Sequence, residues 1–294
     1  MSAVIAAAAQ HPTAVLAPAH PRKRRVIRSR SGQVGVCITL AVAAAAVLAP
    51  VLARHAFDAV AFDHILTPPF WAPGGSLQYP LGTDQLGRDT FSRLLFGART
   101  SLIIGVGAVL IAGAIGVMLG IIGGYAGGWL DDLIGRVADL QLAFPPIFLA
   151  ITVMAVVGQT FLNLVLVLGI VSWVQYARVV RGSTLSVKHL DFVGAARALG
   201  ARDSRILLRH IAPNVLEPVI AIATVNVSTM IMAEAGLSFL GLGVQPPTPS
   251  WGGMLADSRD AWAVAPWNAI LPGLAIFVTV LGVNLLGSEL TGES

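Results

Sequence analysis

The sequence predicts an all-α membrane protein that crosses the bilayer six times and keeps both termini in the cytoplasm. Of its 294 residues, 55% are hydrophobic and only 12% are charged, and the mean hydropathy is +0.78. This composition is far too apolar for a soluble globular domain. Of the 19 Lys and Arg residues, 6 lie at positions 22–30 and 7 at positions 178–209. Because basic clusters stay on the inner side during membrane insertion, both regions are expected in the cytoplasm.

The N-terminal region predicts a basic tail followed by a first crossing. Residues 1–33 are rich in Ala, Pro and basic side chains, so we expect a disordered cytoplasmic segment whose run RKRRVIRSR lies at the membrane surface. Residues 34–53 carry no charge, and twenty residues suffice to cross a hydrocarbon core of roughly 30 Å. A secretory signal peptide has a similar layout. A first transmembrane helix is favoured because the apolar run is longer than a usual signal core and the later chain keeps crossing.

Residues 54–98 are expected to form an external loop. Positions 54–101 carry four basic and four acidic residues, as expected of a segment without a positive bias. The string LGTDQLGRD predicts a turn, and Asp89 can cap a helix that follows it. Asp84 and Asp89 lack the further acidic ligands of a calcium loop. Both are therefore expected to be structural.

Three further crossings are predicted at Leu102–Ile122, Val137–Val157 and Phe161–Val174. In the first of them, glycines recur at four-residue steps from Gly116 to Gly124, which predicts a face that packs closely against another helix. The second contains Pro145-Pro146. Because proline removes a backbone N–H group, this helix is expected to bend or break.

A basic amphipathic insert, DFVGAARALGARDSRILLRHIAPN, occupies residues 191–214. The i, i+3, i+4, i+7 spacing of four residues predicts one face of a short helix: Phe192, Ala195, Ala196 and Leu199. Gly200 interrupts that helix, and a second helix can begin at Asp203, whose side chain can cap it. Pro213 marks its end or a bend into the next crossing. An amphipathic helix lying on lipid headgroups is the alternative interpretation.

Ala195-Ala196, followed by Gly200 and Pro213, gives this insert a resemblance to the EAA loop of binding-protein-dependent ABC importer permeases. In that family the loop is a cytoplasmic coupling helix that docks into a groove of an ATPase subunit. The Glu that usually opens the motif is Gly194 here. The resemblance implies a coupling loop at residues 178–214 with ATPase-coupling residues Gly194, Ala195, Ala196, Arg197, Gly200, Ala201, Arg209 and Pro213.

Two longer strings carry a more specific resemblance. LGTDQLGRDTFSRLLFGARTSL, from Leu81, and MAEAGLSFLGLGVQPPTPSWGGML, from Met232, are similar to the dipeptide, oligopeptide and nickel branch of these permeases. The resemblance implies a type I importer transmembrane domain with five helices at residues 99–288. The family usually continues with a basic amphipathic tail, whereas this chain is expected to have only a short cytoplasmic tail at residues 289–294.

The last two crossings are predicted at Val215–Phe239 and Trp267–Leu286. The first of them carries Asn226 and Glu234. Because a polar or charged group inside the membrane is costly unless it is used, both are expected to line the translocation route or its gate. A carboxylate paired locally at the interface is the alternative for Glu234. Three tryptophans near the external loop suit a membrane interface: Trp251, Trp262 and Trp267.

The resemblance implies one subunit of a larger plasma-membrane assembly. The implied partners are a second, similar permease, two ATPase subunits or one fused ATPase, and an external substrate-binding protein. Neither Lys23 nor Lys188 follows a glycine, so the chain has no P-loop, and it also lacks GxSxG and HExxH motifs. We expect no enzyme site, cofactor or metal in this chain, and ATP with magnesium on the ATPase subunits. The basic clusters flank membrane segments and predict no nucleic-acid partner.

The resemblance predicts ATP-driven import of dipeptides or oligopeptides into the cytoplasm. Nickel complexes, haem and glutathione are cargoes of similar systems and remain alternatives. A secondary transporter would need intramembrane ionisable residues for ion coupling, and the crossings offer few beyond Asp139 and Glu234. A scaffold without transport activity is the remaining alternative, and it would purify without an ATPase.

The distribution of basic residues predicts that His189 lies in the cytoplasm and Gln78 outside. Single cysteines at these positions, in a Cys37→Ser background, are treated with a membrane-impermeant thiol reagent on intact cells. We expect labelling at position 78 and none at 189 until the cells are opened. Labelling of position 189 from outside would refute this topology.

Overall fold

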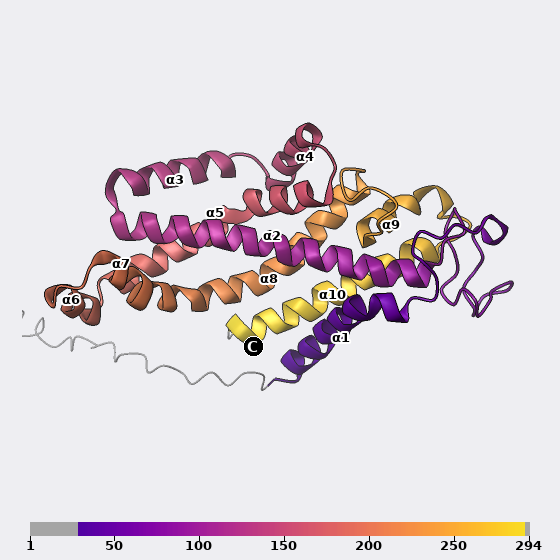
Figure 1. Ribbon diagram of the computed structural model, residues 1–294, viewed down its shortest axis with the longest axis horizontal. Coiled ribbons are helices and arrows are strands. Elements are labelled where there is room, and N and C mark those ends of the chain that lie inside the picture. Colours follow the sequence, from indigo (N-terminus) through magenta and orange to yellow (C-terminus); the bar gives the residue numbers. More distant parts are fainter. Residues whose placement is uncertain (1–28, 292–294) are drawn as a thin grey trace, which may run out of the picture.

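The computed structural model describes residues 29–291, and every regular element named in this range is a helix. Five helical segments of that range are long and apolar enough to cross a membrane. They contain α1 (Arg30–Leu52), α2 (Thr90–Ala126), α5 (Phe161–Lys188), α8 (Ala212–Phe239) and α10 (Trp267–Thr291). These helices form one elongated bundle (Figure 1). The chain is an all-α polytopic membrane protein.

The shorter helices lie at the ends and on one side of this bundle. They are α3 (Gly128–Leu142), α4 (Pro146–Val157), α6 (Asp191–Ala198), α7 (Asp203–Ile206) and α9 (Trp251–Asp257). A π-helical turn at Leu207–Ile211 joins α7 to α8, and 3₁₀ turns occur at Phe62–His64 and Arg259–Ala261. Figure 1 places α6 and α7 at one end of the bundle, and α9 with the loop after α1 toward the other.

Several helices extend beyond the crossings predicted from the sequence. α1 begins at Arg30, so the end of the segment expected to be disordered is helical; residues 1–28 lie outside the described range. α2 begins at Thr90, inside the expected external loop, because Asp89 accepts hydrogen bonds from the N–H groups of Phe91 and Ser92.

α5 continues to Lys188, so residues 178–188 of the expected coupling loop belong to this helix. α10 likewise continues through Thr291, into the expected tail.

The contact between α2 and α5 occupies the centre of the bundle. The predicted glycine face of α2 meets α5 along its whole length, at Gly116, Gly120 and Gly124. A Cβ atom placed on Gly120 would stand 2.7 Å from the carbonyl oxygen of Ala177 and 2.7 Å from Cβ of Val180. Carbon atoms without a bond between them prefer about 3.5–4.0 Å. The predicted close helix packing is thus confirmed, and it requires glycine.

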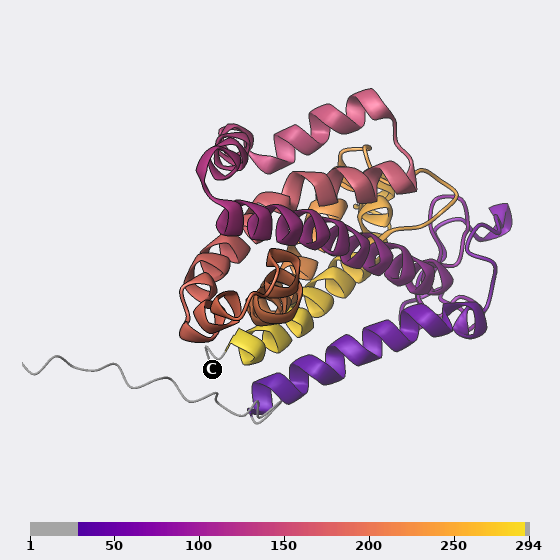
Figure 2. The same ribbon diagram turned by 60° about the vertical axis from the view of Figure 1, so that its left-hand side comes forward.

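α1 packs against α10, also through glycine. A Cβ on Gly282 would stand 2.8 Å from Cβ of Ile38. At the start of α1, the backbone N–H of Ser29 donates to Glu289 Oε1 over 3.2 Å, and the Ser29 hydroxyl donates to Oε2. A carboxylate at a helix N-terminus is favourable because the helix dipole is positive there. Figure 2 shows α1 along the outer edge of the bundle.

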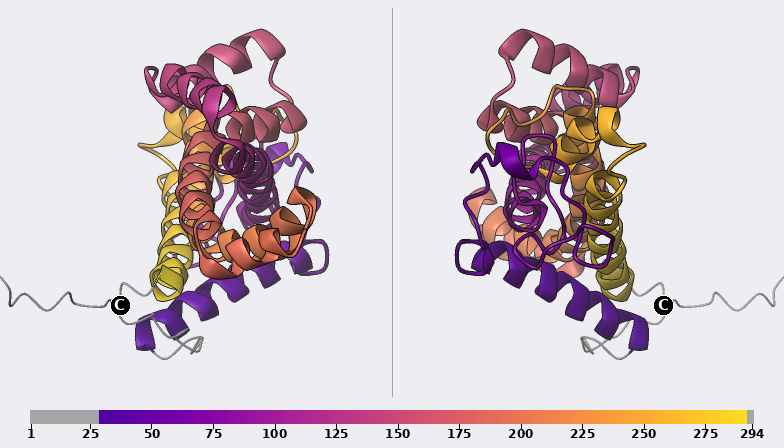
Figure 3. Two further views of the ribbon diagram at one scale, coloured as in Figure 1. Left: turned by 90° about the vertical axis from the view of Figure 1, so that its left-hand side faces the viewer. Right: turned by 90° about the vertical axis from the view of Figure 1, so that its right-hand side faces the viewer.

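The predicted break at Pro145-Pro146 is confirmed, because the axes of α3 and α4 differ by 87°. The expected third crossing is therefore two short helices. Ion pairs hold α3 to α5: Arg181 donates to Asp131, and Arg178 Nη2 donates to Asp139 Oδ1 over 2.7 Å. The end-on views of Figure 3 place this pair of helices on one side of the bundle and α1 on the opposite side.

Replacing Gly120 by Leu is expected to force α2 away from α5 and to lower the free energy of unfolding by about 1–3 kcal/mol, the usual cost of overpacking. Thermal unfolding of the purified protein in detergent measures the effect as a lower melting temperature. The matched control is Gly135→Leu on α3, where an added Cβ meets nothing within 4 Å. Equal melting of both variants would mean that the α2–α5 contact can be widened without cost.

Candidate functional site

The predicted coupling loop protrudes at one end of the bundle, where α6 and α7 meet the ends of α2 and α5 (Figure 1). Its inner face is apolar. Val193 of α6 and Ile206 of α7 are fully buried and pack in one cluster with Val180 of α5. Burying side chains of this size contributes about 1.5–3 kcal/mol each. The loop is therefore a packed part of the protein, which agrees with its predicted division into two helices.

Gly200 separates the two helices, as predicted. Its φ angle is +80°, a conformation that costs other residues energy because their Cβ crowds the backbone. No atom lies within 4 Å of the position that a Cβ would occupy there. The requirement for glycine is thus set by the backbone turn alone.

One local prediction for this loop, the cap at Asp203, was wrong in detail. The N-cap of α7 is Arg202, and no side chain caps that helix end. Asp203 instead accepts a hydrogen bond from the hydroxyl of Tyr125. The predicted apolar face of α6 points outward, with Phe192 45% and Leu199 88% exposed, because Val193 is the residue that anchors the helix.

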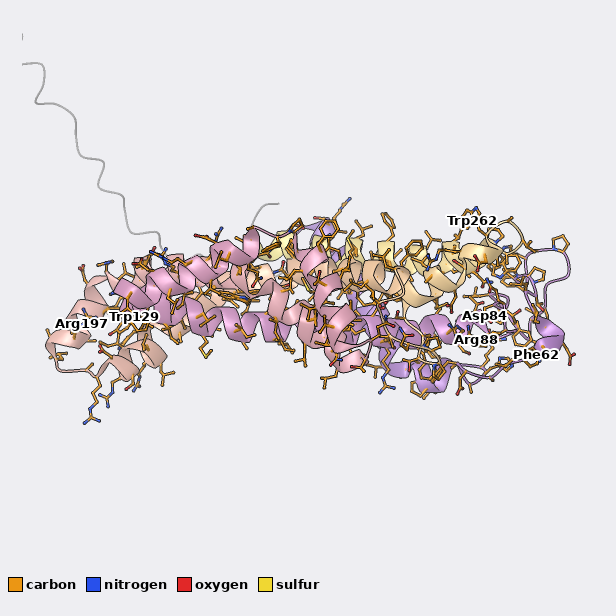
Figure 4. All side chains as sticks on the ribbon, turned by 90° about the horizontal axis from the view of Figure 1, so that it is seen from above. Phe62, Asp84, Arg88, Trp129, Arg197 and Trp262 are labelled. Carbon is orange, nitrogen blue, oxygen red and sulfur yellow. The ribbon has the colours of Figure 1, made fainter. Side chains whose placement is uncertain are left out.

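The loop consequently presents a mixed apolar and basic surface. Gly194, Ala195, Arg197, Gly200, Arg209 and Pro213 are exposed, whereas Ala196 and Ala201 are partly buried. Leu199 and Leu208, the latter 77% exposed, add apolar area. Figure 4 places Arg197 at this end of the molecule, far from Asp84 and Arg88. Large apolar side chains exposed together with basic ones on one loop are a feature expected of a contact with another protein.

The opposite end is organised by buried ion pairs that sequence reasoning missed. Arg88 Nε donates to Asp84 Oδ2 over 2.7 Å, and Arg93 Nη2 donates to Asp257 Oδ2 over 3.2 Å. Both arginine side chains are less than a tenth exposed. A buried charge is tolerated only when it is paired and hydrogen-bonded. The expectation that Asp84 and Asp89 are structural is confirmed, since Asp84 belongs to this network and the buried Asp89 caps α2.

The same residues line a cavity of about 390 Å³ between the loop before α2 and the turn that follows α9. Its polar wall includes Asp84, Arg88, Arg93 and Asp257. Asp257 lies far from the other three in sequence, so no local spacing could reveal the cluster. Within residues 29–291 no group of three or more potential metal ligands occurs.

Glu234 lies beneath this network and is fully buried. Its carboxylate accepts hydrogen bonds from Ser101 Oγ of α2 at 2.9 Å and from Ser238 Oγ of α8 at 2.6 Å. The Ser101 hydroxyl in turn accepts one from the N–H of Trp251 in α9. Glu234 therefore joins three helices in this structure. Its predicted place at the translocation route or gate stays a prediction.

Asn226 is 6% exposed and its Nδ2 donates to Gln175 Oε1 over 3.2 Å. Gln175 is exposed on α5. The pair thus brings two amides from α5 and α8 together on the surface of an apolar bundle. This arrangement is compatible with the predicted place of Asn226 beside a route, which stays a prediction.

The tryptophans expected at the membrane interface differ in exposure, and their place at the interface stays a prediction. Trp262 is 55% exposed, whereas Trp251 is 2% exposed. Trp251 packs against Gly97, and its Nε1 donates to the carbonyl of Leu94 over 3.1 Å. It is an internal anchor of α9 because its indole N–H finds a protein partner.

Comparison with known proteins shows the family of this chain. The family described as "binding-protein-dependent transport system inner membrane component" matches residues 116–290, more than half of the chain. The chain belongs to this family. It is the transmembrane permease subunit of an ABC importer, a multi-pass inner-membrane protein.

Curated relatives resemble this permease along almost its whole length. It is 43% identical over 283 residues to the glutathione transport system permease protein GsiD of Escherichia coli O6:K15:H31. Over the same length it is 44% identical to the proteins of that name from Shigella boydii serotype 4 and Escherichia coli O157:H7. In each case the match covers 95% of this chain and 90% of the relative.

Replacing Glu234 by Ala is expected to loosen the external end of the permease. The hydroxyls of Ser101 and Ser238 would lose their acceptor in a dry site, at a cost of about 1–3 kcal/mol. Glu234→Gln keeps one acceptor oxygen and is expected to cost less. The melting temperature and the resistance of the external loop to limited proteolysis are expected to fall from the parent to Glu234→Gln, and further to Glu234→Ala. An unchanged melting temperature for Glu234→Ala would contradict the role of Glu234 as a joint between helices.

Proposed function

We propose that this permease serves the ATP-driven import of glutathione and related short peptides into the cytoplasm. The observation that carries the proposal is the identity of 43% over 95% of the chain to a permease named for glutathione transport. Glutathione is itself a tripeptide, so the peptide substrate expected from the sequence and glutathione share amide and carboxylate groups. A site for either must offer hydrogen-bond partners that replace water.

The polar pair on α5 and α8 supports a route for such molecules. Asn226 and Gln175 each carry an amide, which can both donate and accept. Their amides lie 3.2 Å apart at the surface of a bundle that is otherwise largely apolar. In the proposed assembly, a second permease would face this surface, and the two chains would enclose the substrate between them.

The coupling loop supports docking of an ATPase on the other side of the membrane. Its inner face is anchored by Val193 and Ile206, while Leu199 and Leu208 project outward. Arg197 and Arg209 add exposed positive charge. The proposed partner therefore has a groove with an apolar floor and acidic margins, and hydrolyses ATP with magnesium. The external substrate-binding protein would meet the end that carries Asp84 and Asp257.

The proposal is tested by reconstituting the permease with its second permease, ATPase and binding protein in proteoliposomes that contain ATP. Labelled glutathione is expected to accumulate inside, with a dipeptide as the comparison substrate. Asn226→Leu is expected to reduce uptake about tenfold, because the change removes a hydrogen-bonding group from the route and leaves its volume nearly unchanged.

Thr152→Val is the matched control, since Thr152 Oγ1 donates only to the Phe148 carbonyl of its own helix, at 2.9 Å. Accumulation of the dipeptide without glutathione would make peptides the substrate. Accumulation of neither would refute the proposed substrate class. Full uptake by Asn226→Leu would remove Asn226 from the route.

A further inference from the structure

We infer that Tyr125, at the inner end of α2, is the residue that transmits movement of the coupling loop to the membrane helices. The inference deepens the proposed function, on which it rests, by assigning the transmitting contact. Tyr125 is the penultimate residue of α2, and α2 is followed at once by Gly127, whose φ is +65°. The side chain therefore lies where the helix ends and the chain turns back.

Three segments converge on this one side chain. The Tyr125 hydroxyl donates to Asp203 Oδ1 of α7 and accepts from Arg197 Nη2 of α6 over 3.4 Å. Lys188 Nζ, at the end of α5, donates to the Tyr125 carbonyl over 2.6 Å and lies 5.5 Å from the ring centroid. Both helices of the coupling loop and the end of α5 are thus bonded to a single residue of α2.

The chemistry of this contact needs a phenol. A phenolic hydroxyl can donate one hydrogen bond and accept another at the same time, so it bridges the carboxylate of Asp203 and the guanidinium of Arg197. Hydrogen bonds to charged groups are stronger than those between neutral groups. Phenylalanine would keep the ring in the apolar cluster around Val193 and Ile206 and remove only the bridge.

α2, the helix that contains Tyr125, can transmit a displacement along its length. α2 runs without interruption for 37 residues from Thr90, and its glycine face locks it to α5. At its outer end, Ser101 bonds Glu234 and Arg93 pairs with Asp257. A force applied to Tyr125 therefore reaches the external network through continuous, closely packed helix.

An open depression beside Tyr125 leaves room for such a movement. A volume of about 730 Å³ lies between the end of α2 and the loop, lined by Tyr125, Ala126, Lys188, Arg197, Asp203 and Leu207. The loop is thus joined to the end of α2 by polar contacts beside this depression, in addition to its apolar packing. Directional hydrogen bonds can be broken and remade between two states, whereas an interlocked apolar contact resists small shifts.

Tyr125→Phe tests the inference in the complete reconstituted complex. We expect the number of substrate molecules imported per ATP hydrolysed to fall at least tenfold, while the ATPase subunits still co-purify and basal ATP hydrolysis stays within twofold of the parent. Thr152→Val, which removes a hydroxyl bonded only within α4, should leave all three quantities unchanged. Import per ATP within twofold of the parent for Tyr125→Phe would overturn the inference.

A double-mutant cycle checks that the bridge, and not the loop fold, carries the effect. Asp203→Asn keeps the size of the side chain and one acceptor oxygen, so a smaller loss is expected. The double variant should be no worse than Tyr125→Phe alone, because Asp203→Asn only weakens a bond that Tyr125→Phe already removes. Losses that multiply in the double variant would overturn the inference, since the two residues would then act separately.

A spectroscopic measurement separates this inference from the choice of substrate. A fluorophore is attached at Leu77→Cys in the external loop, where the native side chain is 73% exposed, in a Cys37→Ser background. A non-hydrolysable ATP analogue is expected to change its emission in the parent complex and not in Tyr125→Phe. A change retained in Tyr125→Phe, or no change in the parent, would overturn the inference whether or not glutathione is imported.

Discussion

The close approach of α2 and α5 is the constraint on which the rest of this permease depends. Glycines on α2 bring the backbones so near that a single added Cβ would collide with Val180 or with the Ala177 carbonyl. In lipid, helix association gains little from the hydrophobic effect and relies on van der Waals contact and hydrogen bonds. The glycine face supplies that contact at the centre of the bundle, and α3, α6 and α8 are placed relative to the pair.

The two ends of the bundle differ in whether their charged side chains are buried in ion pairs or exposed. At the end expected to be external, the buried side chains of Arg88 and Arg93 pair with Asp84 and with Asp257, whose side chain is 43% exposed. At the cytoplasmic end, the basic residues of the loop stay largely exposed. The first arrangement is costly to break and fixes the fold of the external loop. The second leaves charge free for a partner, as expected for a subunit that works only in a complex.

The sequence predicted the features that depend on local chemistry. The break at Pro145-Pro146, the turn at Gly200, the cap at Asp89 and the glycine face all follow from what a residue does to its own backbone or helix face. Pairings between distant segments could not be predicted in this way.

Two residues illustrate that limit. The bond between Glu234 and Ser101 could not be predicted because the two residues lie 133 positions apart, and Asp203 looked like a cap because Tyr125 lies 78 positions away. Helix ends were also misplaced, since backbone hydrogen bonding continues past the last apolar residue at both ends of α2 and at the end of α5.

The pairing of α1 with α10 has a consequence for how the chain is made. α1 is synthesised before α10, yet the carboxylate at its start, Glu289, belongs to α10. Until then α1 must reside in the bilayer without its neighbour. Its composition allows this, because no charged residue occurs between Ser31 and Ala53 and little of the helix is buried inside the protein. α1 can therefore stay in the bilayer against α2 and lipid until α10 is made, and α10 then supplies the close contact at Gly282 and the carboxylate at the start of α1.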